Sequence, residues 1–108
     1  DDDTDRHPDI TVYLRESSPG EENPARVPDI IFEVVTPGRP AHDRDYVQKR
    51  SDYEQVGVRE YVIVDRFEHC VTVLRREDDK FIESTLQEGD DYTTPLLPDL
   101  RIPLHGII

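Results

Sequence analysis

The sequence has very little cysteine and no methionine or tryptophan. Its one cysteine, Cys70, cannot form a disulfide within the chain, so we expect a reducing compartment such as the cytoplasm. No apolar stretch approaches the length of a membrane span, and no signal or transit segment is visible. These absences argue against a disulfide-stapled secreted module, and we expect no membrane partner.

Several motifs of catalysis are also missing from the sequence. The chain has no glycine-rich phosphate loop, no nucleophile elbow and no pairing of cysteine with histidine. Its histidines, at His7, His42, His69 and His105, lack the spacing of metal ligands, and His69 is interpreted as a turn residue. The sequence therefore does not support a P-loop enzyme, a serine or cysteine hydrolase, or a zinc site.

Basic residues are scarce. The chain has 13 Lys and Arg residues against 25 Asp and Glu residues, which gives a formal net charge of −12. Such a charge opposes non-specific binding to nucleic acid, which depends on neutralising phosphates. Positions 36–50 are locally basic, because they contain Arg39, Arg44, Lys49 and Arg50. Any contact with phosphates is expected in that stretch.

The length of 108 residues predicts one domain, positions 1–108. Positions 1–6 are acidic and are expected to be flexible. Because the chain has no methionine and opens on an acidic run, we expect it to be a fragment of a longer protein that lacks the first elements of its domain.

The hydrophobic pattern predicts a mixed α/β sheet with one crossover helix. The helix is expected at 43–56, with Gly57 ending it. The segment 95–108, with three prolines, is interpreted as an irregular tail that packs on the sheet. The strands on both sides of the helix should be parallel neighbours. Strands are expected at 10–14, 28–36, 60–65, 71–74 and 81–86.

One glutamate interrupts an otherwise apolar run, Pro28-Asp29-Ile30-Ile31-Phe32-Glu33-Val34-Val35-Thr36. The pattern is typical of a strand that is covered on both faces. A carboxylate in such a strand loses hydration and normally persists only if it is paired, hydrogen-bonded or bound to a metal. Glu33 is therefore the first candidate for chemistry, with a solvent-facing or ion-paired structural glutamate as the alternative.

A metal site requires a second oxygen ligand near Glu33. Asp29 is a poor candidate, because four residues along one strand span roughly 13 Å. Asp9 heads the neighbouring predicted strand, and adjacent strands can bring two carboxylates within the span of one metal ion. We therefore expect Asp9 to be the partner, and Asp29 to be a turn or strand-entry residue.

The predicted helix has one face that is expected to pack on the sheet. Tyr and Val residues are ordinary core residues on such a face, but the ammonium group of Lys49 is not. Lys49 could reach the Glu33 strand, or it could turn outward and pair with Asp45 or Asp52. The face contains Tyr46, Lys49, Tyr53 and Val56.

These residues, in this order, resemble the PD-(D/E)XK nuclease superfamily. Pro8-Asp9 is followed by Glu33 in an apolar strand and then by a helix with Lys49. Val35 stands where the strand lysine of the superfamily is usual. The finer resemblance is to the Uma-type restriction endonuclease family, in which the lysine lies on the helix, and it rests on three runs: 28–37, 45–49 with Tyr53, and 57–65.

The resemblance implies a restriction-endonuclease-like fold that lacks the N-terminal helix and strand of the family. It also implies a bacterial, cytoplasmic enzyme that hydrolyses DNA phosphodiester bonds with Mg²⁺ or Mn²⁺. Asp9, Glu33 and the carbonyl of Val34 would hold the metal, and Lys49 would orient the attacking water or stabilise the developing charge. The basic residues Arg39, Arg44 and Arg50 would contact DNA phosphates.

The acidic composition keeps a second interpretation open. A catalytically silent module with a nuclease fold could use an acidic surface to bind or regulate another protein. The complete set of Asp9, Glu33 and Lys49 favours the enzyme. The sequence leaves open the DNA sequence and strandedness that would be recognised and the oligomeric state, for which a homodimer is one alternative.

Overall fold

The computed structural model describes residues 9–14, 27–35 and 42–108, and for residues 42–47 it describes the backbone alone. One helix, α1 (His42–Val56), follows the second strand. Within the described residues, two strands precede this helix, and five strands follow it. The strands are β1 (Ile10–Val12), β2 (Ile30–Val35), β3 (Glu60–Asp65), β4 (Cys70–Glu77), β5 (Lys80–Leu86), β6 (Asp91–Thr94) and β7 (Leu97–Pro103).

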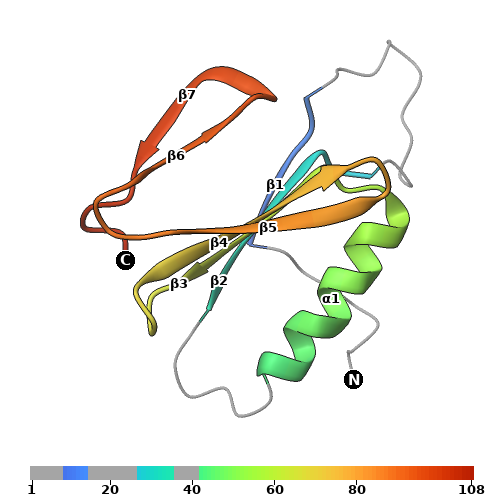
Figure 1. The fold of residues 1–108 in the computed structure, drawn as a ribbon, viewed down its shortest axis with the longest axis horizontal. Coiled ribbons are helices and arrows are strands. Elements are labelled where there is room, and N and C mark those ends of the chain that lie inside the picture. The colour runs from blue at the N-terminus through green and yellow to red at the C-terminus, as the bar shows by residue number, and fades with distance from the viewer. Residues whose placement is uncertain (1–8, 15–26, 36–41) are drawn as a thin grey trace.

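Five strands form one mixed sheet in the order β1-β2-β3-β4-β5. β2 and β3 are parallel, while the other neighbouring pairs are antiparallel. Parallel neighbours need a crossover connection, and α1 lies in the segment that joins β2 to β3 (Figure 1). The predicted mixed α/β sheet with a crossover helix is confirmed.

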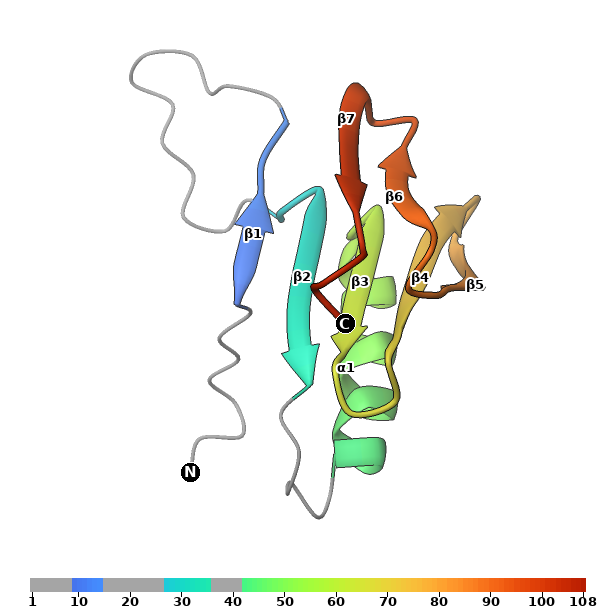
Figure 2. The same cartoon turned by 90° about the vertical axis from the view of Figure 1, so that its left-hand side faces the viewer.

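The helix and the β6–β7 hairpin lie on opposite sides of this sheet (Figures 1 and 2). Successive residues of a strand point to opposite faces, so Ile31 and Glu33 of β2 face α1 while Ile30 and Phe32 face the hairpin. Both faces of β2 and β3 are thus covered, as their apolar sequences require. The core on the helix side consists of Ile31, Tyr53, Val58, Tyr61, Leu74 and Phe81.

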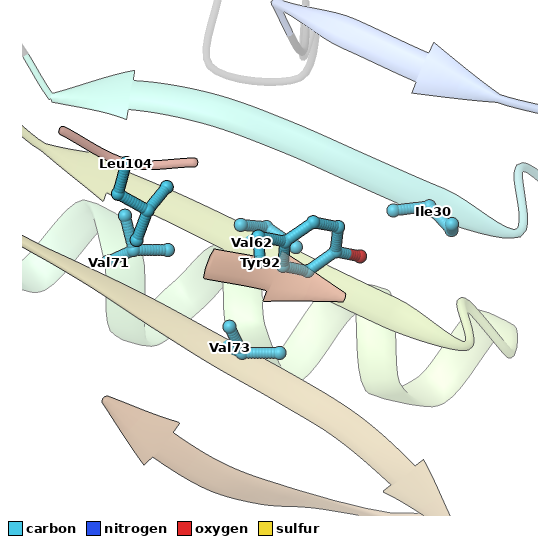
Figure 3. Packing of buried hydrophobic residues seen from close by; sticks show 6 residues of the cluster. All are labelled: Ile30, Val62, Val71, Val73, Tyr92 and Leu104. Carbon is cyan, nitrogen blue, oxygen red and sulfur yellow. The ribbon is translucent and has the colours of Figure 1, made fainter. Parts of the chain in front are cut away.

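The core on the hairpin side is closed by Tyr92 of β6 and by Leu104, which follows β7 (Figure 3). The ring of Tyr92 packs edge-on against Phe32, with 5.6 Å between ring centroids. Such contacts contribute about 0.5–1.5 kcal/mol beyond the burial of area. The sheet contributes Ile30, Val62, Val71 and Val73 to this cluster.

The segment after β5 corrects one expectation. Residues 95–108 are predicted to be irregular, but they contain β7, which forms a β-hairpin with β6. In this hairpin Tyr92 pairs with Ile102 and Thr94 pairs with Leu97. Pro98 and Pro103 lie within β7, where a sheet of two strands leaves one edge of each strand unpaired and the missing N–H is tolerated. The expectation that this segment packs on the sheet is confirmed.

The end of α1 corrects a second expectation. Val56 was assigned to the buried face, but it is 56% exposed. It is the last residue of the helix and lies about 60° around the helix axis from the buried Tyr53. Gly57 then reverses the chain with φ +100°, and Val58 enters the core instead, with no exposed surface. Gly57 ends the helix as expected.

Candidate active site

Glu33 lies near the middle of β2, on the face that α1 covers, and is 5% exposed. Oε1 of Glu33 accepts a hydrogen bond from Lys49 Nζ at 2.9 Å, and the two groups form an ion pair. Lys49 lies in a middle turn of α1, and its aliphatic stem carries the ammonium group to the sheet. The side chain is 18% exposed. The structure thus brings together the two residues that the sequence placed on neighbouring elements.

Two tyrosine hydroxyls also donate to Glu33. Tyr53 of α1 donates to Oε2 at 3.2 Å, and Tyr61 of β3 donates to Oε1 at 3.3 Å. The rings contact each other edge to face, with centroids 4.9 Å apart. Sequence reasoning treated Tyr53 as a core residue and gave Tyr61 no role. The sequence did contain a signal for Tyr61, because a tyrosine in a buried strand needs a hydrogen-bond partner for its hydroxyl.

Asp9 immediately precedes β1, which is an edge strand and the antiparallel neighbour of β2. Ile10 pairs with Phe32, and the same antiparallel register continued by one residue sets Asp9 opposite Glu33. Asp9 Oδ2 accepts a hydrogen bond from the backbone N–H of Val34 at 2.7 Å. The expectation that the Asp9 and Glu33 strands are neighbours is confirmed.

Asp29 has a structural role, as expected for a strand-entry residue. Its Oδ2 accepts from the N–H of Leu14 at 2.9 Å, and its own N–H donates to the carbonyl of Val12 at 2.8 Å. These bonds take over from the sheet ladder where β1 ends, which explains why β1 stops at Val12 and not at Leu14. Arg59 lies 3.5 Å from its other carboxylate oxygen.

The predicted phosphate contacts are only partly within the described structure. Arg39 lies outside the described residues, and for Arg44 only the backbone is described. Arg50 Nη1 lies 3.0 Å from Glu83 Oε1 of β5, and both side chains are well exposed. Arg50 therefore ties α1 to β5 in this structure, and an anion would have to compete with Glu83 for it.

The carboxylate oxygens of Asp9, just before β1, and of Glu33, in β2, are of the kind that Mg²⁺ and Mn²⁺ accept. Among the side chains that the structure describes, in residues 9–14, 27–35 and 48–108, no group of three or more Asp, Glu, His or Cys residues could hold a metal ion. Mg²⁺ does not need such a group, because it is commonly held by one or two carboxylates together with waters and substrate phosphates. Asp9 and Glu33, which the register sets opposite each other, supply two carboxylates of the kind that such a site uses.

A second buried glutamate lies on the opposite face of the sheet. Glu60 of β3 is 2% exposed and accepts hydrogen bonds from Tyr92 and Thr94 of β6, while Arg75 Nε lies 3.1 Å away. Sequence reasoning did not single out Glu60, because it stands at the start of its strand. Among the residues that the structure describes, its donors come from β4 and from the hairpin, so this carboxylate joins the hairpin to the sheet.

A protein-family model matches most of the chain. Residues 1–105 match the model of the Uma2 family, which is described as "Putative restriction endonuclease". The chain belongs to the Uma2 family. Membership supports a nuclease-like, hydrolytic function at a coarse level.

A solved structure with a similar fold carries the same kind of description. It is a "putative nuclease belonging to DUF820" from Anabaena variabilis, with a TM-score of 0.67 and 17% sequence identity. The alignment covers 90% of this chain and 56% of that one, so this Uma2 chain spans little more than half the length of that protein. At this identity the likeness shows the fold alone.

No curated protein matches the chain. Among the residues that the structure describes, no helix combines the length and the apolar character needed to cross a membrane.

Proposed function

We propose that this Uma2 chain contains the catalytic centre of a Mg²⁺-dependent endonuclease that hydrolyses DNA phosphodiester bonds. The observation that carries the proposal is the arrangement around Glu33: a buried carboxylate that contacts a lysine, on a strand whose neighbour presents Asp9. Family membership supports a nuclease-like reaction, and Asp9, Glu33 and Lys49 are the residues that we assign to it. Mn²⁺ would be expected to replace Mg²⁺.

Each residue of the site would have a distinct task. Asp9, Glu33 and the carbonyl of Val34 would hold the metal ion, which when bound polarises the scissile phosphate. Lys49, once released from Glu33, would donate hydrogen bonds to the attacking water or to the developing negative charge. The helix side of the sheet excludes most solvent from Glu33, and this strengthens each of these electrostatic interactions.

The acidic composition makes DNA binding depend on local positive charge. The formal net charge of −12 repels phosphates over most of the surface. The bound metal and the basic positions Arg39, Arg44 and Arg50 would have to supply the attraction. Binding and cleavage should therefore be sought at low salt, where few phosphate contacts are sufficient.

One observation favours the second candidate, a catalytically silent binding module with an acidic surface that faces another protein. Both oxygens of Glu33 already accept hydrogen bonds from Lys49, Tyr53 and Tyr61. A buried carboxylate satisfied in this way can be purely structural. The two candidates differ in whether the site binds a metal ion at all.

Calorimetric titration with Mn²⁺ separates the two candidates. The wild type should bind, while Asp9→Asn and Glu33→Gln should each weaken binding by about tenfold or more, since each removes a charged ligand. Glu60→Gln is the matched control, because it changes a glutamate of similar burial on the other face of the sheet. Circular dichroism verifies that each variant is folded.

The same proteins are then tested for cleavage of supercoiled plasmid, duplex and single-stranded DNA at low salt, with Mg²⁺ and Mn²⁺ compared. Metal-dependent cleavage by the wild type and Glu60→Gln, without cleavage by the other two variants, is the expected result. If the wild type neither binds Mn²⁺ nor cleaves any of these DNAs, the enzyme proposal fails and the binding module takes its place.

A further inference from the structure

The two tyrosines on Glu33 hold its carboxylate from two separate elements. Tyr53 belongs to α1 and donates to Oε2, and Tyr61 belongs to β3 and donates to Oε1. Both rings are buried, with exposures of 7% and 0%, and they brace each other edge to face. A buried, packed ring has little freedom to move, so the two hydroxyls fix both the position and the rotation of the carboxylate.

We propose that Tyr53 and Tyr61 are positioning residues that keep the Glu33 carboxylate in place for a metal ion. This inference rests on the proposed function above. A tyrosine hydroxyl is a neutral donor, so it can hold a carboxylate without neutralising the negative charge that attracts the cation. Lys49, in contrast, carries the charge that a metal ion would replace.

The geometry distinguishes the tyrosines from the lysine. A carboxylate offers about four lone-pair sites, and the hydroxyls use one on each oxygen of Glu33. Lys49 has a flexible stem and keeps 18% of its exposure, so of the three donors it is the one able to leave. When it leaves, the tyrosines retain the carboxylate and its lone pairs remain available to a cation on both oxygens.

The structure supplies a matched control on the other face of the sheet. Tyr92 is also buried, with 1% exposure, and its hydroxyl also donates to a buried glutamate, Glu60. Replacement of either kind of tyrosine by phenylalanine removes one hydroxyl from one buried carboxylate and preserves the ring. A purely structural effect should therefore be similar for Tyr92→Phe and for Tyr53→Phe or Tyr61→Phe.

The experiment measures the Kd for Mn²⁺ by calorimetry in the wild type and in Tyr53→Phe, Tyr61→Phe and Tyr92→Phe, together with the melting temperature of each protein. Loss of a group that orients a metal ligand typically costs 10–100-fold in affinity. We expect about a tenfold increase in Kd for Tyr53→Phe and for Tyr61→Phe, and an unchanged Kd for Tyr92→Phe. All three variants should melt at lower temperature than the wild type.

The outcomes separate this inference from the function on which it rests. If the wild type binds Mn²⁺ and all three variants bind it equally well, the positioning role is overturned while the metal site stands. If Tyr92→Phe weakens binding as much as the other two, the effect is one of general stability and the inference is again overturned. If the wild type itself does not bind Mn²⁺, the metal site fails and the positioning role fails with it.

Discussion

Replacing Lys49 by methionine removes the cation that lies 2.9 Å from Glu33 and preserves a side chain of similar shape. At that separation two unit charges attract each other by about 6 kcal/mol for an effective dielectric constant near 20. Desolvation offsets much of this attraction, and removing one partner of a buried pair costs about 3–5 kcal/mol. Because Lys49 keeps 18% of its exposure and two hydroxyls remain on Glu33, we expect a loss of about 2–4 kcal/mol in unfolding free energy.

The matched control is Arg50→Met, one residue further along the same helix. Arg50 pairs with Glu83 at 3.0 Å, but the two side chains are 42% and 51% exposed. Exposed pairs of this kind contribute about 0–1 kcal/mol, so this variant should remain close to the wild type. Urea unfolding, extrapolated to zero denaturant, measures both values under the same conditions.

A double-mutant cycle tests whether Glu33 causes the loss. Glutamine at position 33 needs no countercharge, so Glu33→Gln combined with Lys49→Met should be more stable than the sum of the single losses predicts, by at least about 1 kcal/mol. Equal, small losses for Lys49→Met and Arg50→Met would refute the reasoning, as would a cycle without coupling. In that case the ion pair with Glu33 would contribute no more than a surface pair.

Two further predictions concern the hairpin side of the sheet. Glu60→Ala should lower the unfolding free energy by about 3 kcal/mol or more. The reason is that Tyr92 and Thr94 lose their buried acceptor and Arg75 loses its counterion. A loss under about 1 kcal/mol in urea unfolding would contradict this structural role of Glu60. Burial and the hydrogen bond to Glu60 raise the pKa of Tyr92 above its ordinary value. The unfolded tyrosine ionises near pH 10 while the folded one keeps its proton, so stability should fall as the pH rises above about 10. Tyr92→Phe should lose less stability than the wild type over that range, and identical pH profiles would contradict the assignment.

The sequence was sufficient to predict the central elements of the fold. The apolar run around Glu33, the helix that ends at Gly57 and the apolar run after Glu60 predicted a parallel pair with a crossover helix. Long apolar runs and glycine stops are local signals, so they can be recognised without tertiary information. The hairpin at Asp91–Pro103 was not predicted, because its three prolines oppose strand formation and its strands are stabilised by contacts with a sheet distant in sequence.

The site was also predictable only in part, because some of its contacts join elements that are distant in sequence. Glu33 stood out because its neighbours are apolar, and Lys49 stood out because it lies on the face of Tyr53. The hydrogen bond from Tyr61 could not be predicted, because it depends on the register between β2 and β3, which pairs Ile31 with Tyr61. The hydrogen bond from Tyr53 depends on how α1 packs on the sheet, which is also a tertiary feature. A register shift of one residue would move Tyr61 to the other face of the sheet.

The two buried glutamates show why position in the sheet matters more than burial. Glu33 and Glu60 are almost equally buried, and each accepts hydrogen bonds from tyrosine and lies beside one basic side chain. Glu33 has an edge strand, β1, beside its own strand, and the exposed Asp9 adds a second carboxylate just before β1 begins. Glu60 instead faces the hairpin, whose hydroxyls enclose it. The proposed cation would approach Glu33 from the side of Asp9, next to the edge strand, whereas it would have to displace the hairpin to reach Glu60. We therefore propose the metal site at Glu33 and not at Glu60.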